Sequence, residues 1–199
     1  FGDQLIALVS TPNDADRDVA GLWNSISAQS GFFRVAYCET HDLTGNLNGP
    51  GAKRLPARID AANPASYFAR KRSMLAAAVV LTMPAMPMLF MGQEMLEDEQ
   101  FASNNPLDWT HATTYAGVVR FFRDMVHLRR NLDGVSAGLT GPNVTQQHLN
   151  NGNKVLAYHR WGAGPDDQVI VVMNWSANTR SNYTVGFPAD GTWYVNLNS

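Results

Sequence analysis

The sequence predicts an α/β fold in which βα units of a parallel sheet are followed by an antiparallel, all-β region. Two short apolar runs, Val35–Cys38 and Met88–Met91, have the length and composition of strands that are buried on both faces. Each run is followed by a segment with helical spacing, and this order of strand, helix, strand and helix is typical of a parallel barrel. After Gly134 the pattern changes to short runs separated by turns, which indicates antiparallel strands.

Apolar residues recur at helical spacing in four segments, which we predict to be helices: Phe1–Val9, Asp16–Ala28, Ala65–Leu81 and Tyr115–Asn131. Pro64 favours the start of the third helix there, because the first helical turn does not need the N–H that proline lacks. Beyond Gly134 the predicted strands are Val155–Trp161, Val169–Trp175, Tyr183–Phe187 and Trp193–Leu197. A long loop from Gly92 to Thr113 separates the second strand from the last helix, and such loops are usually functional.

Composition bounds the kind of protein this is. The chain has 199 residues, of which 45% are hydrophobic, so it can bury a sizeable core in one or two domains. A formal charge of −2 gives no reason to expect nucleic acid or an anionic membrane as a partner. Cys38 is the only cysteine, which excludes an intramolecular disulfide and a thiolate metal cluster.

The sequence also indicates which cofactors and which cellular location to expect. The five histidines show no ligand spacing, and Glu97, Asp98 and Glu99 do not alternate as a calcium loop does, so we expect neither a metal nor another cofactor. No apolar run is long enough to cross a bilayer, and Phe1–Gln4 has no signal-peptide pattern, so a cytoplasmic location is expected. Because the first residue is not Met, the true start could lie further upstream.

Polar residues follow the first predicted strand directly. Glu39, Thr40, His41 and Asp42 come after Cys38 and lead into a loop rich in turn-forming residues: Gly45, Asn46, Gly49, Pro50 and Gly51. A parallel barrel presents its chemistry in this way, because the strand fixes the backbone and its carboxyl end directs the side chains into the site. For the His–Asp pair alone, the alternative of a hydrogen-bonded strand end without catalytic function stays open.

Three segments together resemble the α-amylase superfamily of glycoside hydrolases and transglycosylases, and within it the α-1,4-glucan branching enzymes. They are Tyr37–Asp42, Met86–Glu94 and the Asn105–Trp109 loop. Weaker similarity to the terminal β domain of those enzymes extends through Leu156–Trp161, Val169–Trp175 and Gly186–Pro188. The resemblance covers the chain from about Val35 onward.

The resemblance implies roles for particular residues. Asp42 matches the family's third catalytic-site carboxylate, which stabilises the transition state, and His41 matches the neighbouring imidazole; both would hydrogen-bond sugar hydroxyls beside the scissile bond. Glu39 and Glu94 are further candidates for substrate binding, although Glu94 could equally satisfy loop backbone. Thr40 departs from the commoner Asn, which bears on fine specificity. The nucleophile and the acid/base would lie on earlier strands, outside this chain.

The resemblance also implies an organisation and a function. Residues 1–134 would be the last βα units of an incomplete (β/α)8 TIM barrel, and residues 135–199 a C-terminal all-β domain whose end could also be cut short. The expected function is that of a 1,4-α-glucan branching enzyme, a retaining transglycosylase of starch and glycogen metabolism with an α-glucan as its partner. The alternatives are an α-amylase-type hydrolase and a non-catalytic glucan-binding fragment. Residues 1–199 alone are expected to be inactive.

Overall fold

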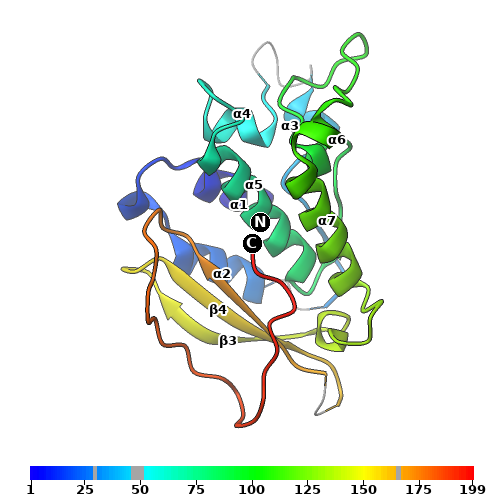
Figure 1. Cartoon of the computed structure of the whole chain (residues 1–199). Helices are drawn as coiled ribbons and strands as arrows, with labels where there is room; N and C mark the ends of the chain where they lie inside the picture. Colours follow the sequence, from blue (N-terminus) through cyan, green and yellow to red (C-terminus); the bar gives the residue numbers. More distant parts are fainter. Residues whose placement is uncertain (29–30, 46–51, 165–166) are drawn as a thin grey trace.

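The computed structural model describes residues 1–28, 31–45, 52–164 and 167–199. Helices form most of the first two thirds of the chain, and a three-stranded antiparallel sheet lies beneath them in Figure 1. Most of the turn-rich loop predicted after Asp42 falls on residues 46–51, which lie outside the described residues. No helix in the described part of the chain is both long enough and apolar enough to cross a membrane.

The two predicted N-terminal helices are confirmed as α1 (Gly2–Ser10) and α2 (Val19–Ser27), with the short 3-10 turn η1 (Asp14–Asp16) between them. The side chain of Asp18 accepts a hydrogen bond from the Gly21 N–H at 3.0 Å. This cap fixes the start of α2 a few residues later than predicted, because it satisfies an N–H that has no partner inside the helix.

Helix α5 (Tyr67–Thr82) is the central helix of the fold, and α7 (Ala116–Arg129) packs along one side of it (Figure 1). Both helices were predicted within two residues at each end. Ser66 caps α5 by accepting the Ala69 N–H at 3.2 Å. One face of α5 packs against α7, and the opposite face contributes to the main core. A helix that is buried on two sides is well suited to organise the elements around it.

The parallel strands are shorter than predicted. Strand β1 (Val35–Ala36) pairs with β2 (Met86–Pro87), so the predicted strand Met88–Met91 is wrong in position by two residues. The Met88 N–H still donates to the Ala36 carbonyl at 2.9 Å, but the Phe90 N–H donates to the Gln93 side chain at 3.2 Å. Because that N–H is taken locally, the ladder ends where the chain turns into η3 (Gln93–Met95).

The antiparallel region is a sheet in the order β3, β4, β5. Strands β4 (Val155–Trp161) and β5 (Val169–Asn174) agree with the prediction, whereas β3 (Asn143–Asn150) is a polar strand that was not predicted along its length. A register irregularity between Gln146 and His148 bends β3 against β4.

The predicted strands Tyr183–Phe187 and Trp193–Leu197 are wrong, because those residues form no regular strand. Tyr183 instead contacts β3 through its hydroxyl, which lies 2.8 Å from His148 Nε2. The Trp193 indole N–H donates locally, to the Ala189 carbonyl at 3.3 Å. This final segment therefore makes side-chain contacts in place of a backbone ladder.

One core joins the helices to the sheet. Leu156, Tyr158, Met173 and Trp175 of the sheet region pack in the same buried cluster as residues of α1 and α2. Smaller elements complete the fold: α3 (His41–Thr44), α4 (Leu55–Ile59), α6 (His111–Thr114) and η4 (Ala137–Leu139). The predicted boundary at residue 134 is therefore crossed by continuous packing.

Two buried arginines satisfy the C-terminal end of α5. Arg129 of α7 donates to the carbonyls of Met83 at 2.8 Å and Ala85 at 2.5 Å. Arg160 of β4 is fully buried and donates to the Thr82 carbonyl. The last carbonyls of a helix have no partner within it, and cations are favourable there because of the helix dipole. These arginines thus connect α5 to α7 and to the sheet.

Candidate functional site

The site predicted from the sequence lies at the edge where β1 and β2 end. The strands are parallel, with Val35 opposite Met86, so the segments that follow them leave the sheet at the same edge. A buried hydrogen bond from Gln93 Nε2 to Cys38 Sγ, at 2.7 Å, joins those two segments. Burial raises the pKa of the Cys38 thiol well above its ordinary value, so this cysteine is neutral and part of the core.

His41 and Asp42 form the first turn of α3. Thr40 caps this turn by accepting the Leu43 N–H on its hydroxyl at 3.1 Å. His41 Nε2 lies 3.3 Å from Asp42 Oδ1, and the two side chains are 65% and 58% exposed. The structure thus brings the imidazole and the carboxylate together on an accessible surface. A pair of this kind can offer a sugar hydroxyl both a hydrogen-bond donor and a charged acceptor.

Glu39, two residues before His41, has a different environment. Its side chain is 2% exposed, one carboxylate oxygen accepts the Leu55 N–H, and the other lies 3.5 Å from Arg54 Nε. Burial raises the pKa of Glu39, and the charge of Arg54 opposes that rise. A carboxylate enclosed in this way cannot hydrogen-bond a sugar in this conformation. The expectation that Glu39 binds substrate is therefore not supported by its position.

Arg54 connects the segments around the site. Its guanidinium donates to the Met91 carbonyl at 2.6 Å and lies 4.9 Å from the centroid of the Phe90 ring. Together with the ion pair to Glu39, these contacts hold the segment after β1, the start of α4 and the segment after β2 in one arrangement. The predictions made from sequence did not include Arg54. In the sequence Arg54 is the second of two adjacent cations, Lys53 and Arg54, before the apolar Leu55-Pro56, and nothing there sets it apart.

We expect Glu39→Gln in the full-length protein to destabilise this region by about 2 kcal/mol, because hydrogen bonds to charged groups contribute about 1.5–3 kcal/mol and Arg54 would lose its buried counter-charge. Amide hydrogen exchange of the segments around Glu39 and Met91 measures the effect. Glu99→Gln, in an open loop, is the matched control and should change exchange little. Equal protection in both variants would show that the Glu39–Arg54 pair does not hold the site.

Glu94 lies in η3 and lines a hollow of about 620 Å³ between the segment after β2 and helix α7. Met91 and Val126 line the same hollow. Glu94 is partly exposed and is therefore accessible to a ligand. Residues of α7 form the other side of the hollow. Its role in substrate binding stays a prediction.

Glu97 organises the long loop before α6. Its carboxylate accepts three backbone N–H groups, from Asp98 and Glu99 at 3.1 Å each and from Asp108 at 2.9 Å. Asp108 in turn accepts the Thr110 N–H at 2.9 Å. These hydrogen bonds hold the backbone of the loop at Asp108.

Glu97, Asp98 and His111 bring possible metal-ligand atoms within 4.8 Å of one another. The oxygens of Glu97 already accept the three N–H groups of its own loop, so that carboxylate has little capacity left for a cation. Acidic groups also commonly gather at a surface without an ion. The absence of a metal stays a prediction from the sequence.

Comparison with known proteins finds a family match for the C-terminal part of the chain. Residues 146–199 match the family described as the alpha amylase C-terminal all-beta domain. A 1,4-alpha-glucan branching enzyme GlgB of Burkholderia thailandensis is 32% identical over 124 residues, which cover 58% of this chain and 14% of that enzyme. The chain is thus similar in sequence to a 1,4-alpha-glucan branching enzyme, and its C-terminal part matches the alpha amylase C-terminal domain family.

Another relative matches a longer part of the chain. A 1,4-alpha-glucan branching enzyme GlgB of Paramagnetospirillum magneticum is 29% identical over 167 residues, or 79% of this chain and 21% of that enzyme. The chain therefore spans about a fifth or less of the length of these curated relatives.

The fold is similar to that of solved structures. A pullulanase from Anoxybacillus sp. LM18-11, crystallised with maltotetraose, has a TM-score of 0.62 at 23% identity over 87% of this chain and 28% of its own. A putative alpha amylase from Salmonella typhimurium has a TM-score of 0.52 at 17% identity, over 76% of this chain and 30% of its own. These likenesses concern the fold and include both the helical region and the sheet.

Proposed function

We propose that this chain is part of a 1,4-α-glucan branching enzyme, a retaining transglycosylase that cuts α-1,4 links and forms α-1,6 links. The observation that carries the proposal is the exposed His41–Asp42 pair beyond a parallel strand pair, in a chain similar to several enzymes of that name. The substrate would be an α-glucan polymer. A cytoplasmic location, expected from the sequence, stays a prediction.

In this proposal residues 1–134 are the last βα units of a (β/α)8 barrel and residues 135–199 are its C-terminal β domain. The exposed apolar residues of the parallel pair support this organisation: Val35 is 49% exposed, Met86 54% and the neighbouring Phe33 95%. Further barrel strands would cover such a surface and would pair the open edges of β1 and β2. Those strands would also carry the nucleophile and the acid/base.

The role of this chain in the reaction follows from the charge that develops on the sugar. Cleavage with retention passes through an oxocarbenium-like transition state, and hydrogen bonds to the hydroxyl beside the anomeric carbon strengthen as positive charge forms. Asp42 would accept such a bond with its charged oxygen, and His41 would donate one from its ring. The two groups lie 3.3 Å apart on one exposed turn, so a single sugar can contact both. The chain alone would then bind glucan at most and catalyse nothing.

A branching reaction has a distinctive product. When the full-length protein is incubated with linear amylose, we expect α-1,6 branch points to form without a matching rise in reducing ends. Each cut made by a hydrolase releases one reducing end, whereas a transferase passes the chain to another glucan. Proton NMR of the anomeric region measures the branches, and a reducing-sugar assay measures the ends.

The second candidate is an α-glucan hydrolase, which the fold likeness to a pullulanase and to a putative α-amylase supports. Extensive release of reducing ends with no branch points would favour it. Failure to produce either product, together with retained binding to amylose, would favour a non-catalytic glucan-binding protein.

A further inference from the structure

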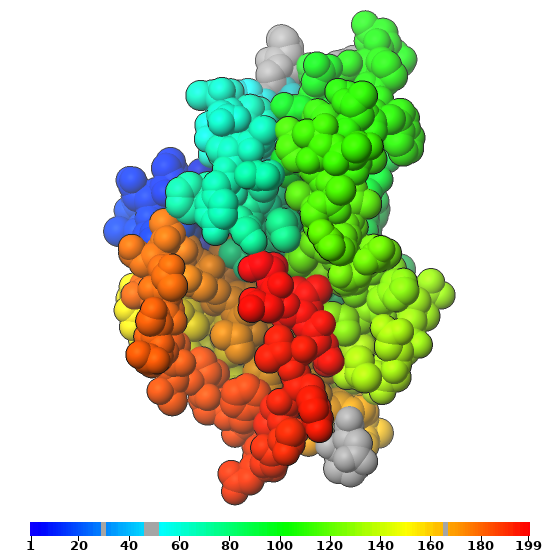
Figure 2. All heavy atoms as spheres, viewed as in Figure 1, coloured from blue at the N-terminus to red at the C-terminus, as the bar shows by residue number. Residues whose placement is uncertain are grey.

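A cavity of about 330 Å³ lies on the other side of α5 from α7. Five residues of α5 line it at helical spacing: Tyr67, Phe68, Lys71, Arg72 and Leu75. The opposite wall is the segment 174–179 after β5, and Asn198 and Ser199 complete the rim. Figure 2 shows this face, where the teal spheres of α5, the orange spheres of the segment after β5 and the red C-terminal spheres meet.

The lining of this cavity is positively charged. Among the described residues, three that line it are Arg or Lys, namely Arg17, Lys71 and Arg72, and none is Asp or Glu. Arg17 is neutralised by Asp14, whose Oδ1 lies 2.5 Å from its Nη1. Within the described part of the chain no ion pair joins Lys71 or Arg72 to a carboxylate. The cavity therefore has two cations without an ion-pair partner among the described residues, and the charge of Asp14 acts on Arg72 from outside the lining.

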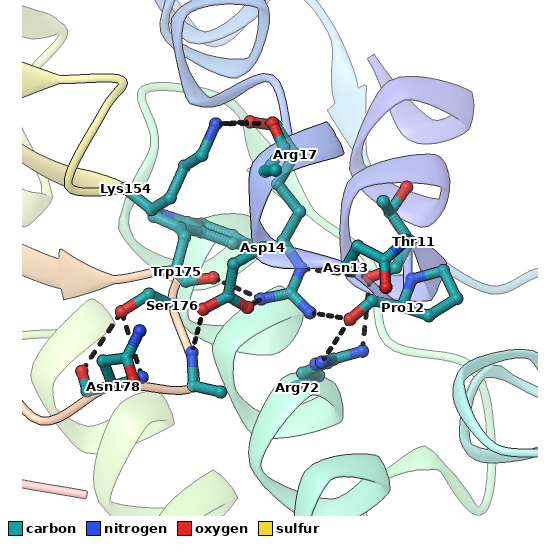
Figure 3. A network of polar contacts seen from close by, with 12 residues as sticks. Thr11, Pro12, Asn13, Asp14, Arg17, Arg72, Lys154, Trp175, Ser176 and Asn178 are labelled. Carbon is teal, nitrogen blue, oxygen red and sulfur yellow. Dashed lines mark hydrogen bonds and ion pairs between the residues drawn. The ribbon is translucent and has the colours of Figure 1, made fainter.

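Arg72 has hydrogen-bonding capacity to spare. Among the described residues its guanidinium makes two long hydrogen bonds, to the Thr11 carbonyl at 3.3 Å and the Pro12 carbonyl at 3.4 Å (Figure 3). A guanidinium carries five N–H donors in a planar fork that matches two oxygens of a phosphate. Burial and then the charge of nearby Arg17 lower the pKa of Arg72, while Asp14 opposes this effect. A bound anion would counteract both the burial and the charge of Arg17, which lower the pKa of Arg72.

Aromatic rings stand beside these cations. Tyr67 is 60% exposed and Phe68 43% exposed, at the start of α5. Lys71 Nζ lies 6.0 Å from the centroid of the Tyr67 ring, and Arg72 lies 5.3 Å from that of Phe68. An exposed ring next to a cation suits a ligand that has an anionic group and a flat or cyclic apolar face. The volume is at the lower end of the range for small-molecule sites and larger than phosphate alone requires.

We propose that this cavity binds a sugar phosphate monoester, with the phosphate between Lys71 and Arg72 and the sugar ring against Tyr67. The site is separate from the His41–Asp42 edge and does not depend on the glucan chemistry proposed above. Lys71 contributes a mobile point charge and Arg72 the planar fork. Asn178 and Thr179 on the opposite wall offer polar groups to the sugar hydroxyls.

The test is isothermal titration calorimetry of the full-length protein with glucose 6-phosphate, inorganic phosphate and maltotriose. We expect glucose 6-phosphate to bind, more weakly as salt is added, and Lys71→Gln or Arg72→Gln to weaken it about tenfold or more. Arg70→Gln is the matched control, because Arg70 is an exposed cation on the same helix that does not line the cavity. It should change the affinity less than twofold.

Each further outcome decides part of the proposal. Tyr67→Ala should weaken glucose 6-phosphate but not inorganic phosphate; equal affinity for the two ligands would overturn the sugar part. No binding of either phosphate at millimolar concentration would overturn the site, as would binding that Lys71→Gln and Arg72→Gln leave unchanged. Maltotriose binding that is lost in those two variants would make the cavity a neutral glucan site instead. Circular dichroism checks that each variant is folded, which is expected because Tyr67 is exposed and Lys71 and Arg72 are partly exposed.

Discussion

Asp42→Asn in the full-length protein is expected to lower turnover on amylose by about 10²–10³-fold, the usual effect of removing one preorganised group that stabilises transition-state charge. The substitution keeps the shape of the side chain and removes its negative charge. The carboxylate is 58% exposed and lies beyond the parallel strand pair, where a substrate can reach it. Turnover at saturating amylose should therefore fall with little change in substrate affinity, because the charge acts mainly in the transition state.

The fold should survive this change, since substitutions at exposed positions usually alter stability by less than about 0.5 kcal/mol. Asp124→Asn is the matched control: Asp124 is an exposed carboxylate on α7, 46% exposed and paired with Arg123, and it should keep full turnover. A variant that retains more than about a third of wild-type turnover would remove Asp42 from the site. Loss of thermal stability in Asp42→Asn would point instead to a role in folding.

The position of this pair could be predicted from sequence because local pattern determines it. An apolar run followed at once by polar residues places those residues near a strand end. In the structure β1 already ends at Ala36, and His41 and Asp42 lie in the short helix α3 and not in the predicted loop. The burial of Glu39 could not be predicted in the same way. It depends on Arg54, fifteen residues later and next to a short helix, α4, that has no periodic pattern. Contacts between segments that lie apart in the chain leave little trace in a single sequence.

Prediction of the β region from sequence is limited for the same reason. Strand β4 agrees with the sequence to the residue, because its apolar run lies between two clear turns. Strand β3 is composed mainly of Asn, Gln, His and Thr, and it becomes a strand because β4 supplies its partner. The apolar residues of 183–187 and 193–197 look like strands, but they have no partner strand among the described residues. Whether each of these three segments forms a strand depends more on an available partner strand than on its local propensity.

Arg160→Met in the full-length protein should destabilise the contact between the helices and the sheet by about 3 kcal/mol. The side chain is fully buried and donates to four backbone carbonyls: Thr82, Leu139, Gly141 and Asn143. Burial, together with the charge of Arg129, lowers the pKa of Arg160 to about 10. Keeping this side chain charged in the core therefore costs free energy. The loss of the hydrogen bonds outweighs the relief of that cost, because each buried carbonyl left without a donor costs about 1–3 kcal/mol.

Amide hydrogen exchange of α5 and β4 measures this loss, since about 3 kcal/mol of local stability corresponds to exchange about 150-fold faster when opening is at equilibrium. Arg160→Lys should give an intermediate result, because an ammonium replaces the charge but cannot reach all four carbonyls. Arg123→Met is the control: Arg123 is 62% exposed on α7, and exchange in α5 should not change. Unchanged protection in Arg160→Met would show that the apolar packing of Leu156 and Tyr158 holds the sheet on α5 without this arginine.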